Sequence, residues 1–268
     1  MRGRVLIVAG SDSGGGAGIQ ADIKTVTALG GYAATAITAL TAQNTLGVFG
    51  VVAVEPSFIV QQMEVVLSDI GADAIKTGML HDAAVVHAVA ETIEAEAAGV
   101  PLVVDPVMVA KGGEALLKPE AVDALQRHLV AIATIVTPNA PEAAALTGLE
   151  IDSAEKQRQA ARALLDIGAK AALVKGGHLA GEVVTDVLAT AAGVEEFTSP
   201  RLDTANTHGT GCTLASAVAT GLAQAKSVHE AVATAHAYVF RAIAEAPGLG
   251  RGHGPLNHTV TIGGRSSD

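Results

Sequence analysis

Short apolar runs recur along the chain, and each is followed by polar or glycine residues and then by apolar residues at helical spacing. The run of residues 5–9 is the first, and Ile19, Ile23 and Val26 follow it at intervals of three or four. Continuous apolar runs of this length are typical of strands buried on both faces, whereas the wider spacing is typical of amphipathic helices. The pattern therefore predicts alternating strands and helices around a mainly parallel sheet.

The same pattern places the individual elements. Strands are expected at residues 5–9, 32–40, 48–54, 74–80, 102–108, 133–137, 171–174, 183–189 and 194–197. Helices are expected to begin at Pro56, after the N-cap Asp82, near Pro119 and at Pro141, because proline and aspartate favour a helix N-terminus. Further helices are expected at residues 153–168, 213–225 and 228–246.

The organisation of the whole chain follows from these elements. No internal repeat, low-complexity linker or break in composition divides the chain, and 268 residues is near the upper limit for one hydrophobic core. We expect a single domain over residues 1–268, with an α/β fold built as a three-layer αβα sandwich and right-handed crossovers. The turn signal at residues 191–193 predicts an antiparallel pair formed by the last two strands.

Composition and charge narrow the class of protein. Hydrophobic residues make up 49% of the chain and the mean hydropathy is +0.40, but no apolar run reaches the ~18 residues that a membrane span requires. A net charge of -10, from 17 basic and 27 acidic residues, argues against a nucleic-acid-binding surface. A single cysteine excludes an intrachain disulfide framework, and no secretory signal is recognisable, so we expect a cytoplasmic protein with no membrane or nucleic-acid partner.

Residues 206–217 have the composition of a helix N-terminus without bulky side chains. Gly209, Thr210 and Gly211 precede the only cysteine, Cys212, and an Ala-rich helical pattern follows. The free N–H groups and the dipole of a first helical turn attract anions, and glycines let an anion approach the backbone. This predicts an anion cradle, in which we expect a lowered pKa for the Cys212 thiol. The alternative is a small-residue helix cap with a buried, inert thiol.

Polar side chains follow the ends of several predicted strands. Because ligands bind outside the carboxyl ends of the strands in open α/β sheets, we expect these groups to meet at one edge. They are Gln43, Asp105, Asn139, Glu142 and Lys175.

Each of these groups has a chemical and a structural interpretation. The amide of Gln43 both donates and accepts, which suits a heteroaromatic ring, although Gln43 could equally be an ordinary loop residue. A nucleotide-bound Mg²⁺ that keeps several waters could be served by Asp105, Asn139 and Glu142. The structural alternative for Asp105 is a solvated acid, and for Glu142 it is an acidic residue favoured by the dipole of a first helical turn. Lys175 could reach a phosphate.

The glycine-rich stretch at residues 10–16 follows the first strand. It lacks the Lys-Ser/Thr pair of a P-loop, and Ile19 stands where the dinucleotide fingerprint requires glycine. Neither nucleotide motif therefore fits. The glycines indicate only that a ligand or another segment approaches the backbone at this edge of the sheet.

Seven stretches together resemble the hydroxymethylpyrimidine/phosphomethylpyrimidine kinases of thiamine biosynthesis, which are members of the ribokinase-like superfamily. Each stretch is weak alone, but all seven occur in the family's order across nearly the whole chain. Cys212 stands where the superfamily more often has aspartate, and it agrees with the pyrimidine-kinase branch. The stretches are residues 10–22 (GSDSGGGAGIQAD), 37–44 (ITALTAQN), 76–80 (KTGML), 105–108 (DPVM), 137–142 (TPNAPE), 175–178 (KGGH) and 206–213 (NTHGTGCT).

The resemblance implies ATP-dependent phosphorylation of 4-amino-5-hydroxymethyl-2-methylpyrimidine and then of its monophosphate, with ATP and Mg²⁺ as cofactors. It implies that the pyrimidine is bound by Gly10, Asp22, Gln43 and Met79. Nucleotide-binding residues would be Asn139, Lys175, Thr207 and Thr210, with Asp105 and Glu142 serving the metal. Phosphoryl transfer would involve Gly209, Gly211, Lys175 and Cys212, with Cys212 accepting the alcohol proton.

Three other functions remain open at this point. A pyridoxal kinase would share the scaffold, the cradle and the metal loop. A cysteine hydrolase or acyltransferase would use Cys212 as nucleophile with His208 or His236 as base, although no partner motif accompanies either histidine. A catalytically silent pyrimidine-binding protein would keep only the fold. None of the motifs encodes the oligomeric state, for which a homodimer is one option, or a monovalent-cation requirement.

Overall fold

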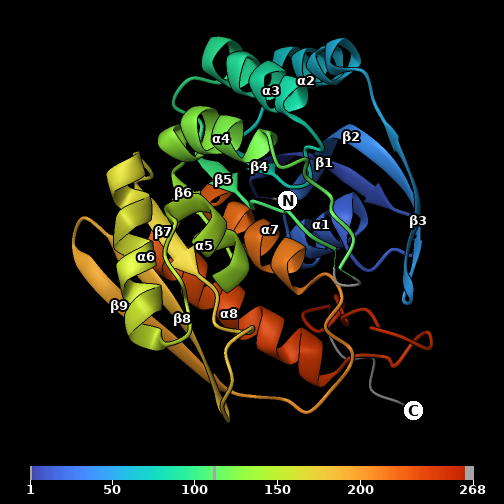
Figure 1. Cartoon of the computed structure of the whole chain (residues 1–268). Coiled ribbons are helices and arrows are strands. Elements are labelled where there is room, and N and C mark those ends of the chain that lie inside the picture. The colour runs from blue at the N-terminus through green and yellow to red at the C-terminus, as the bar shows by residue number, and fades with distance from the viewer. Residues whose placement is uncertain (1, 111–112, 263–268) are drawn as a thin grey trace.

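The computed structural model describes residues 2–110 and 113–262, and all strands in this part of the chain lie in one nine-stranded sheet (Figure 1). The strand order is β3-β2-β1-β4-β5-β6-β7-β8-β9. The strands are β1 (Arg4–Asp12), β2 (Tyr32–Asn44), β3 (Gly47–Ala53), β4 (Ala74–Thr77), β5 (Leu102–Val104), β6 (Ile135–Val136), β7 (Ala171–Val174), β8 (Val183–Thr190) and β9 (Gly193–Pro200).

Six neighbouring strands in the centre of the sheet, β2, β1, β4, β5, β6 and β7, run parallel to one another. At the two sides of the sheet, β3 pairs antiparallel with β2, β8 with β7, and β9 with β8. Val5 to Ala9 in β1 and all residues of β4 to β7 are buried, as expected for strands covered by helices on both faces. Because the central strands are parallel, their carboxyl ends share one edge of the sheet, where a ligand site is expected.

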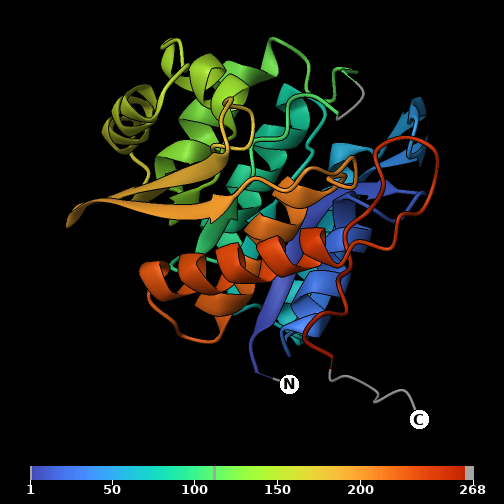
Figure 2. The same cartoon turned by 90° about the horizontal axis from the view of Figure 1, so that it is seen from below.

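Helices cover both faces of the sheet and complete three layers (Figure 2). One face carries α2 (Pro56–Asp69), α3 (Ala83–Glu96), α4 (Ala121–Ala124), α5 (Ala140–Thr147) and α6 (Ala154–Ile167). The other face carries α1 (Gly18–Ala28), α7 (Thr210–Ala223) and α8 (Val228–Ala244). The expected αβα sandwich is confirmed. No helix within the described ranges is long and apolar enough to cross a membrane.

Helix α7 lies between the sheet and its neighbouring helices. Residues 213–222 are buried on every side of the helix, which is possible because most of them are alanine, glycine, serine or threonine. A Cβ on Gly221 would lie 2.7 Å from the Cβ of Ala231 in α8, so the two helices pack at a distance that only glycine permits here. This packing holds the C-terminal part of α7 against α8.

Several elements differ from the sequence expectations. Strands β4 and β5 end at Thr77 and Val104, earlier than the expected residues 80 and 108, and α7 begins at Thr210, before the expected residue 213. Strand β2 runs to Asn44, beyond the expected end at residue 40, because residues 39–44 pair with β3 in an antiparallel hairpin. The helix expected near Pro119 begins at Ala121, after a turn, and continues as a π-helical turn, η1 (Leu125–Leu129), and a 3₁₀ turn, η2 (Val130–Ile132). The extension of β2 matters for function because it places Gln43 on a strand.

Candidate active site

The N-terminus of α7 meets the carboxyl edge of the sheet at Gly211. A Cβ added to Gly211 would lie 3.1 Å from Lys175 Nζ and 3.8 Å from Asp105 Oδ2, so the first turn of the helix faces both charged groups. Lys175 follows β7 and Asp105 follows β5. The convergence predicted for these motifs is therefore confirmed, although the chemical roles of the residues remain predictions.

Gly209 joins the α7 N-terminus to the glycine loop after β1. Its φ of 83° lies in the left-handed region, and a Cβ would lie 1.8 Å from Gly16 O. Glycine is required here both for the backbone conformation and for the close approach. Beside it, Thr210 Oγ1 donates to Thr207 O at 2.8 Å, which fixes the two threonines expected to contact a nucleotide.

Cys212 lies half-buried in the first turn of α7. Burial raises the pKa of its thiol to about 12; the Lys76 ammonium opposes this rise, and the Asp22 and Asp105 carboxylates add to it. The expected lowering of the Cys212 pKa is therefore wrong. The loss of water is the largest cause, and the two carboxylates that add to it lie outside the local motif.

The Asp22 and Lys76 side chains form a fully buried ion pair beneath this turn. Lys76 Nζ lies 3.0 Å from Asp22 Oδ1 and 2.9 Å from Oδ2, and Ser216 Oγ donates to Asp22 Oδ1 at 2.7 Å. Asp22 was expected to bind the pyrimidine edge. Because both of its oxygens have partners and none of its surface is exposed, the geometry favours an electrostatic role over direct contact.

Lys175 is shared by two carboxylates. Its Nζ lies 3.1 Å from Asp105 Oδ1 and 3.9 Å from Glu142 Oε2. Burial disfavours the charged ammonium, but Asp105 and Glu142 keep the pKa of Lys175 above its ordinary value. For Glu142, burial raises the pKa to about 7; Lys175 acts against this rise and Asp105 adds to it. One ammonium group, on Lys175, does not balance the carboxylates of Asp105 and Glu142, so a further cation would be favourable here.

Asn139 and Glu142 also have a structural role, because they form a capping box at the start of α5. Asn139 Oδ1 accepts from the Glu142 N–H at 2.9 Å, and Glu142 Oε2 accepts from the Asn139 N–H at 2.8 Å. Within residues 2–110 and 113–262 no group of three or more His, Cys, Asp or Glu side chains could hold a metal ion. A hydrated Mg²⁺ needs few protein ligands, so the Asp105 and Glu142 oxygens fit such an ion when a nucleotide supplies the others.

Gly10 and Met79 lie side by side near the ends of β1 and β4. A Cβ on Gly10 would lie 3.1 Å from Met79 Sδ, and Met79 O accepts from Thr38 Oγ1 at 2.6 Å. Met79 is almost fully buried. The contact of Met79 with a substrate ring, which the resemblance implies, stays a prediction.

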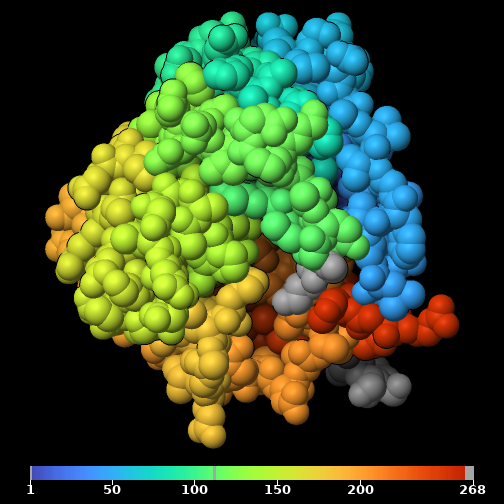
Figure 3. Space-filling view, in the orientation of Figure 1, coloured from blue at the N-terminus to red at the C-terminus, as the bar shows by residue number. Residues whose placement is uncertain are grey.

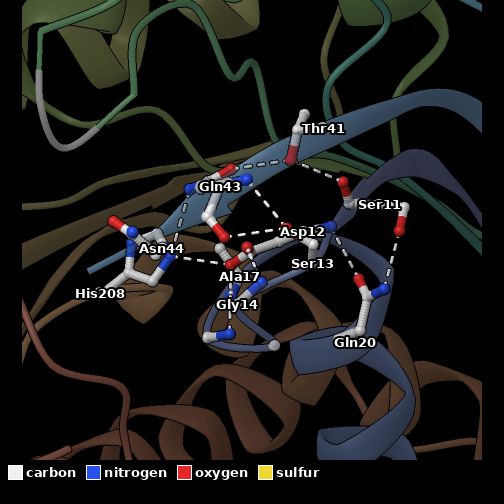
Figure 4. Close-up of polar contacts among 12 residues, drawn as sticks. Ser11, Asp12, Ser13, Gly14, Ala17, Gln20, Thr41, Gln43, Asn44 and His208 are labelled. Carbon is white, nitrogen blue, oxygen red and sulfur yellow. Dashed lines mark hydrogen bonds and ion pairs between the residues drawn. The ribbon is translucent and has the colours of Figure 1, made fainter. Parts of the chain in front are cut away.

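Asp12, His208 and Gln43 form a polar network at the same edge (Figure 4). The Asp12 carboxylate accepts from the N–H groups of Gly14, Gly16 and Ala17 and lies 2.8 Å from His208 Nε2. Asp12 was not among the expected site residues, and His208 was named only as a candidate base for a cysteine nucleophile. Their signal was present in the sequence, since both stand inside the glycine-rich motifs.

A recess opens beside this network. Its lining includes Gln43, Thr45, His208, Glu114 and His253. In the space-filling view the molecule is hollowed between the green chain that follows β5 and the orange-to-red chain that flanks α7 (Figure 3).

Comparison with known proteins identifies the family. A sequence profile described as phosphomethylpyrimidine kinase matches residues 12–257. The chain belongs to this family. It is 49% identical to the hydroxymethylpyrimidine/phosphomethylpyrimidine kinase of Streptomyces coelicolor over 97% of this chain and 95% of that protein. It is 53% identical to the thiamine biosynthesis bifunctional protein ThiED of Geobacter sulfurreducens over 97% of this chain but spans only 53% of that protein.

Solved structures share the fold of this phosphomethylpyrimidine kinase family member. An ADP complex of Bacillus subtilis pyridoxal kinase is 36% identical with a TM-score of 0.90, covering 97% of this chain and 98% of that one. A phosphomethylpyrimidine kinase from Clostridium difficile 630 is 40% identical with a TM-score of 0.80, covering 90% and 99%. The expected ribokinase-like fold is confirmed. Because pyridoxal kinases and phosphomethylpyrimidine kinases share this fold, the fold alone does not show which of the two substrates is phosphorylated.

Proposed function

We propose that this chain phosphorylates 4-amino-5-hydroxymethyl-2-methylpyrimidine and then its monophosphate, using ATP, as a step in thiamine biosynthesis. The observation that carries the proposal is the N-terminus of α7, whose Gly211 faces Lys175 and Asp105. Phosphoryl transfer depends mainly on positioning and on electrostatic stabilisation, and these groups supply both. The names of the curated relatives point to the same substrates.

Nucleotide binding is assigned to the half of the edge around Lys175. A Staphylococcus aureus pyridoxal kinase, 36% identical with a TM-score of 0.89, has been solved with AMP-PCP and pyridoxal. In our proposal Lys175 contacts a phosphate, and Asn139, Thr207 and Thr210 line the nucleotide. Asp105 and Glu142 would hold a hydrated Mg²⁺, which when bound neutralises charge on the phosphate oxygens.

The phosphoryl group would be received at residues 209–212. Backbone N–H groups at a helix N-terminus stabilise the negative charge that develops during transfer. Cys212 is proposed to accept the proton of the attacking hydroxyl. Because the pKa of its thiol is about 12 in the ligand-free protein, this role requires that bound substrate change the balance between Lys76 and the two carboxylates. If the balance does not change, Cys212 only lines the cradle.

The pyrimidine is assigned to the half of the edge around Gln43. The Gln43 amide would bind the ring edge, and Gly10 and Met79 would lie against its face. Pyridoxal is the second candidate substrate, because a pyridoxal kinase of the same fold is 36% identical to this chain.

A coupled ADP-release assay tests both candidates. It compares hydroxymethylpyrimidine, its monophosphate, pyridoxal and ribose at equal concentrations. We expect ADP release with both pyrimidines and little with ribose. Release with pyridoxal alone would assign the second candidate, and pyrimidine binding without any ADP release would indicate a silent binding protein.

A further inference from the structure

His208 Nε2 has two polar neighbours that make opposite demands on it. Asp12 Oδ2 lies 2.8 Å away, and Gln43 Nε2 lies 3.3 Å away (Figure 4). A carboxylate can only accept, so it requires an N–H on His208 Nε2, whereas the amide nitrogen can only donate and requires a bare nitrogen. One ring nitrogen cannot satisfy both neighbours at once.

The same conflict occurs at the other end of the Gln43 amide. Thr41 Oγ1 lies 2.9 Å from Ser11 O and 3.1 Å from Gln43 Oε1. Both are acceptors, but a hydroxyl has a single proton. In this orientation the amide oxygen receives no proton from Thr41 if Thr41 donates to Ser11, and the amide N–H finds no acceptor on His208 if His208 donates to Asp12.

Turning the amide by half a turn about its last bond removes both conflicts. Its oxygen then accepts from the His208 Nε2–H that also serves Asp12, and its nitrogen donates to Thr41 Oγ1. Thr41 keeps its proton for Ser11 O. The oxygen and nitrogen of an amide have nearly the same size, so hydrogen bonding decides between the two orientations.

Asp12 determines the outcome because its charge is held in place. Burial alone would raise its pKa, but the hydrogen bonds from His208, Ala17 and Gly14 keep the pKa below its ordinary value. The side chains of Asp12 and His208 are almost fully buried, so water does not substitute for either partner. A carboxylate in this position keeps the His208 Nε2–H directed toward it, whichever amide orientation is present.

We propose that Asp12 and His208 are specificity-determining positioning residues, which together with Thr41 hold the Gln43 amide with its oxygen toward His208 and its nitrogen toward Thr41. This inference rests on the proposed function, because it assumes that Gln43 binds a pyrimidine edge. The held amide keeps one free lone pair and one free N–H, in a fixed order along the recess. This order of acceptor and donor on Gln43 determines which rings can form both hydrogen bonds with the amide.

Two pyrimidines differ in this order alone. The 4-amino compound has an exocyclic N–H donor beside a ring nitrogen acceptor. Its 4-oxo analogue, in the N3–H form, has an acceptor beside a donor. A fixed amide matches one of them and opposes the other, while a freely turning amide can match both.

The test compares the ratio of kcat/KM for the 4-amino and 4-oxo pyrimidines in wild type, His208→Phe, Thr41→Val and the double variant. Each single variant removes one orienting hydrogen bond and should lower the ratio by roughly three- to tenfold, and the double variant should lower it further. The control is Gln20→Met. Gln20 Oε1 accepts from the Asp12 N–H at 2.8 Å but does not touch the Gln43 amide, so its loss should leave the ratio unchanged.

Two measurements do not depend on turnover. Calorimetric binding of the two pyrimidines without nucleotide gives the same ratio if no variant is active. In the ligand-free protein, ¹⁵N NMR should show a proton on His208 Nε2, and the Gln43 NH₂ protons should give a nuclear Overhauser effect to the Thr41 side chain. A bare His208 Nε2, or an unchanged ratio in folded His208→Phe and Thr41→Val, overturns the inference. Absence of kinase activity with the NMR result intact would contradict the proposed function and leave the amide orientation standing.

Discussion

Lys76 Nζ lies 2.9 Å from Asp22 Oδ2, and neither side chain has any exposed surface. Removing one partner of a buried ion pair leaves the other charge without compensation, which typically costs about 3–5 kcal/mol. We therefore expect Lys76→Met to lower the free energy of unfolding by several kcal/mol, measured by urea denaturation. The double variant Lys76→Met/Asp22→Asn should recover part of this loss, because no net charge then stays buried.

A matched control for the buried pair is the exposed pair of Lys118 and Asp82. Lys118 Nζ lies 3.2 Å from Asp82 Oδ2, with side chains that are 48% and 27% exposed. Lys118→Met should change stability by less than about 1 kcal/mol. Similar losses in the Lys76 and Lys118 variants would contradict the importance of burial for this pair.

His258 gives the protein a pH-dependent stability. Burial lowers its pKa from the ordinary 6.5 to about 4, with a contribution from Lys24, and its Nε2 lies 3.0 Å from Thr213 Oγ1. Between these two pH values the unfolded chain binds a proton that the folded chain does not, so stability falls as the pH falls from 6.5 toward 4. The full effect corresponds to about 3 kcal/mol.

His258→Gln should remove this part of the pH dependence. Urea unfolding of wild type and variant between pH 4.5 and 8, roughly the window set by the two pKa values, gives the difference directly. His87→Gln, at an exposed histidine, serves as the control for changing any histidine. Parallel curves for wild type and His258→Gln would show that the folded and unfolded states protonate this residue alike.

Glu142→Gln should weaken binding of Mg-ATP more than binding of the pyrimidine. Glutamine can still occupy the third position of a capping box, so α5 should keep its N-terminal cap. The charge near Lys175 and Asp105 is lost, and with it one of the two oxygens proposed for the metal's water shell. Separate titrations with nucleotide and pyrimidine measure the two affinities, and equal losses would leave Glu142 with its helix-capping role alone.

The strands of the central sheet could be predicted from the sequence because their environment is encoded locally. Residues 102–104 and 171–174 are continuous apolar runs, and both are buried on each face in the fold. The hairpin of β2 and β3 was predicted only in part. The polar residues Gln43 and Asn44 indicated a loop, but their backbones pair with Val48 and Gly47. Strand pairing, not side-chain polarity, decided that boundary.

The electrostatics of the site could not be predicted in the same way. Lys76 lies 54 positions from Asp22, and His208 lies 196 positions from Asp12, so neither partner can be inferred from a motif. The helix N-terminus at Cys212 was recognised correctly, but the pKa of its thiol is raised first by burial and then by Asp22 and Asp105, which packing brings close to it. The motifs therefore predicted which ionisable residues lie at the site, whereas their pKa shifts depend on partners that only the folded structure brings together.

Cys212 provides the test of the proposed chemistry. If its sulfur accepts the hydroxyl proton, Cys212→Ser should slow the first phosphorylation by about 10²- to 10⁴-fold, the usual contribution of a positioned base. The backbone N–H groups of the cradle are unchanged by this substitution, so both ligands should still bind. Because the thiol has a pKa of about 12 in the ligand-free protein, its alkylation by iodoacetamide near pH 8 should be slow.

The second phosphorylation separates a base from a cradle residue. The attacking oxygen of the monophosphate is already largely ionised near neutral pH, since the second pKa of a phosphate ester is about 6, and it needs no base. Cys212→Ser should therefore affect the second phosphorylation much less than the first, and Cys212→Asp should restore part of the first because a carboxylate can take the same proton. Both rates are measured at saturating substrates by ADP release. Equal slowing of the two steps would assign Cys212 to the geometry of the cradle, and a first step as fast as wild type would remove the sulfur from the chemistry altogether.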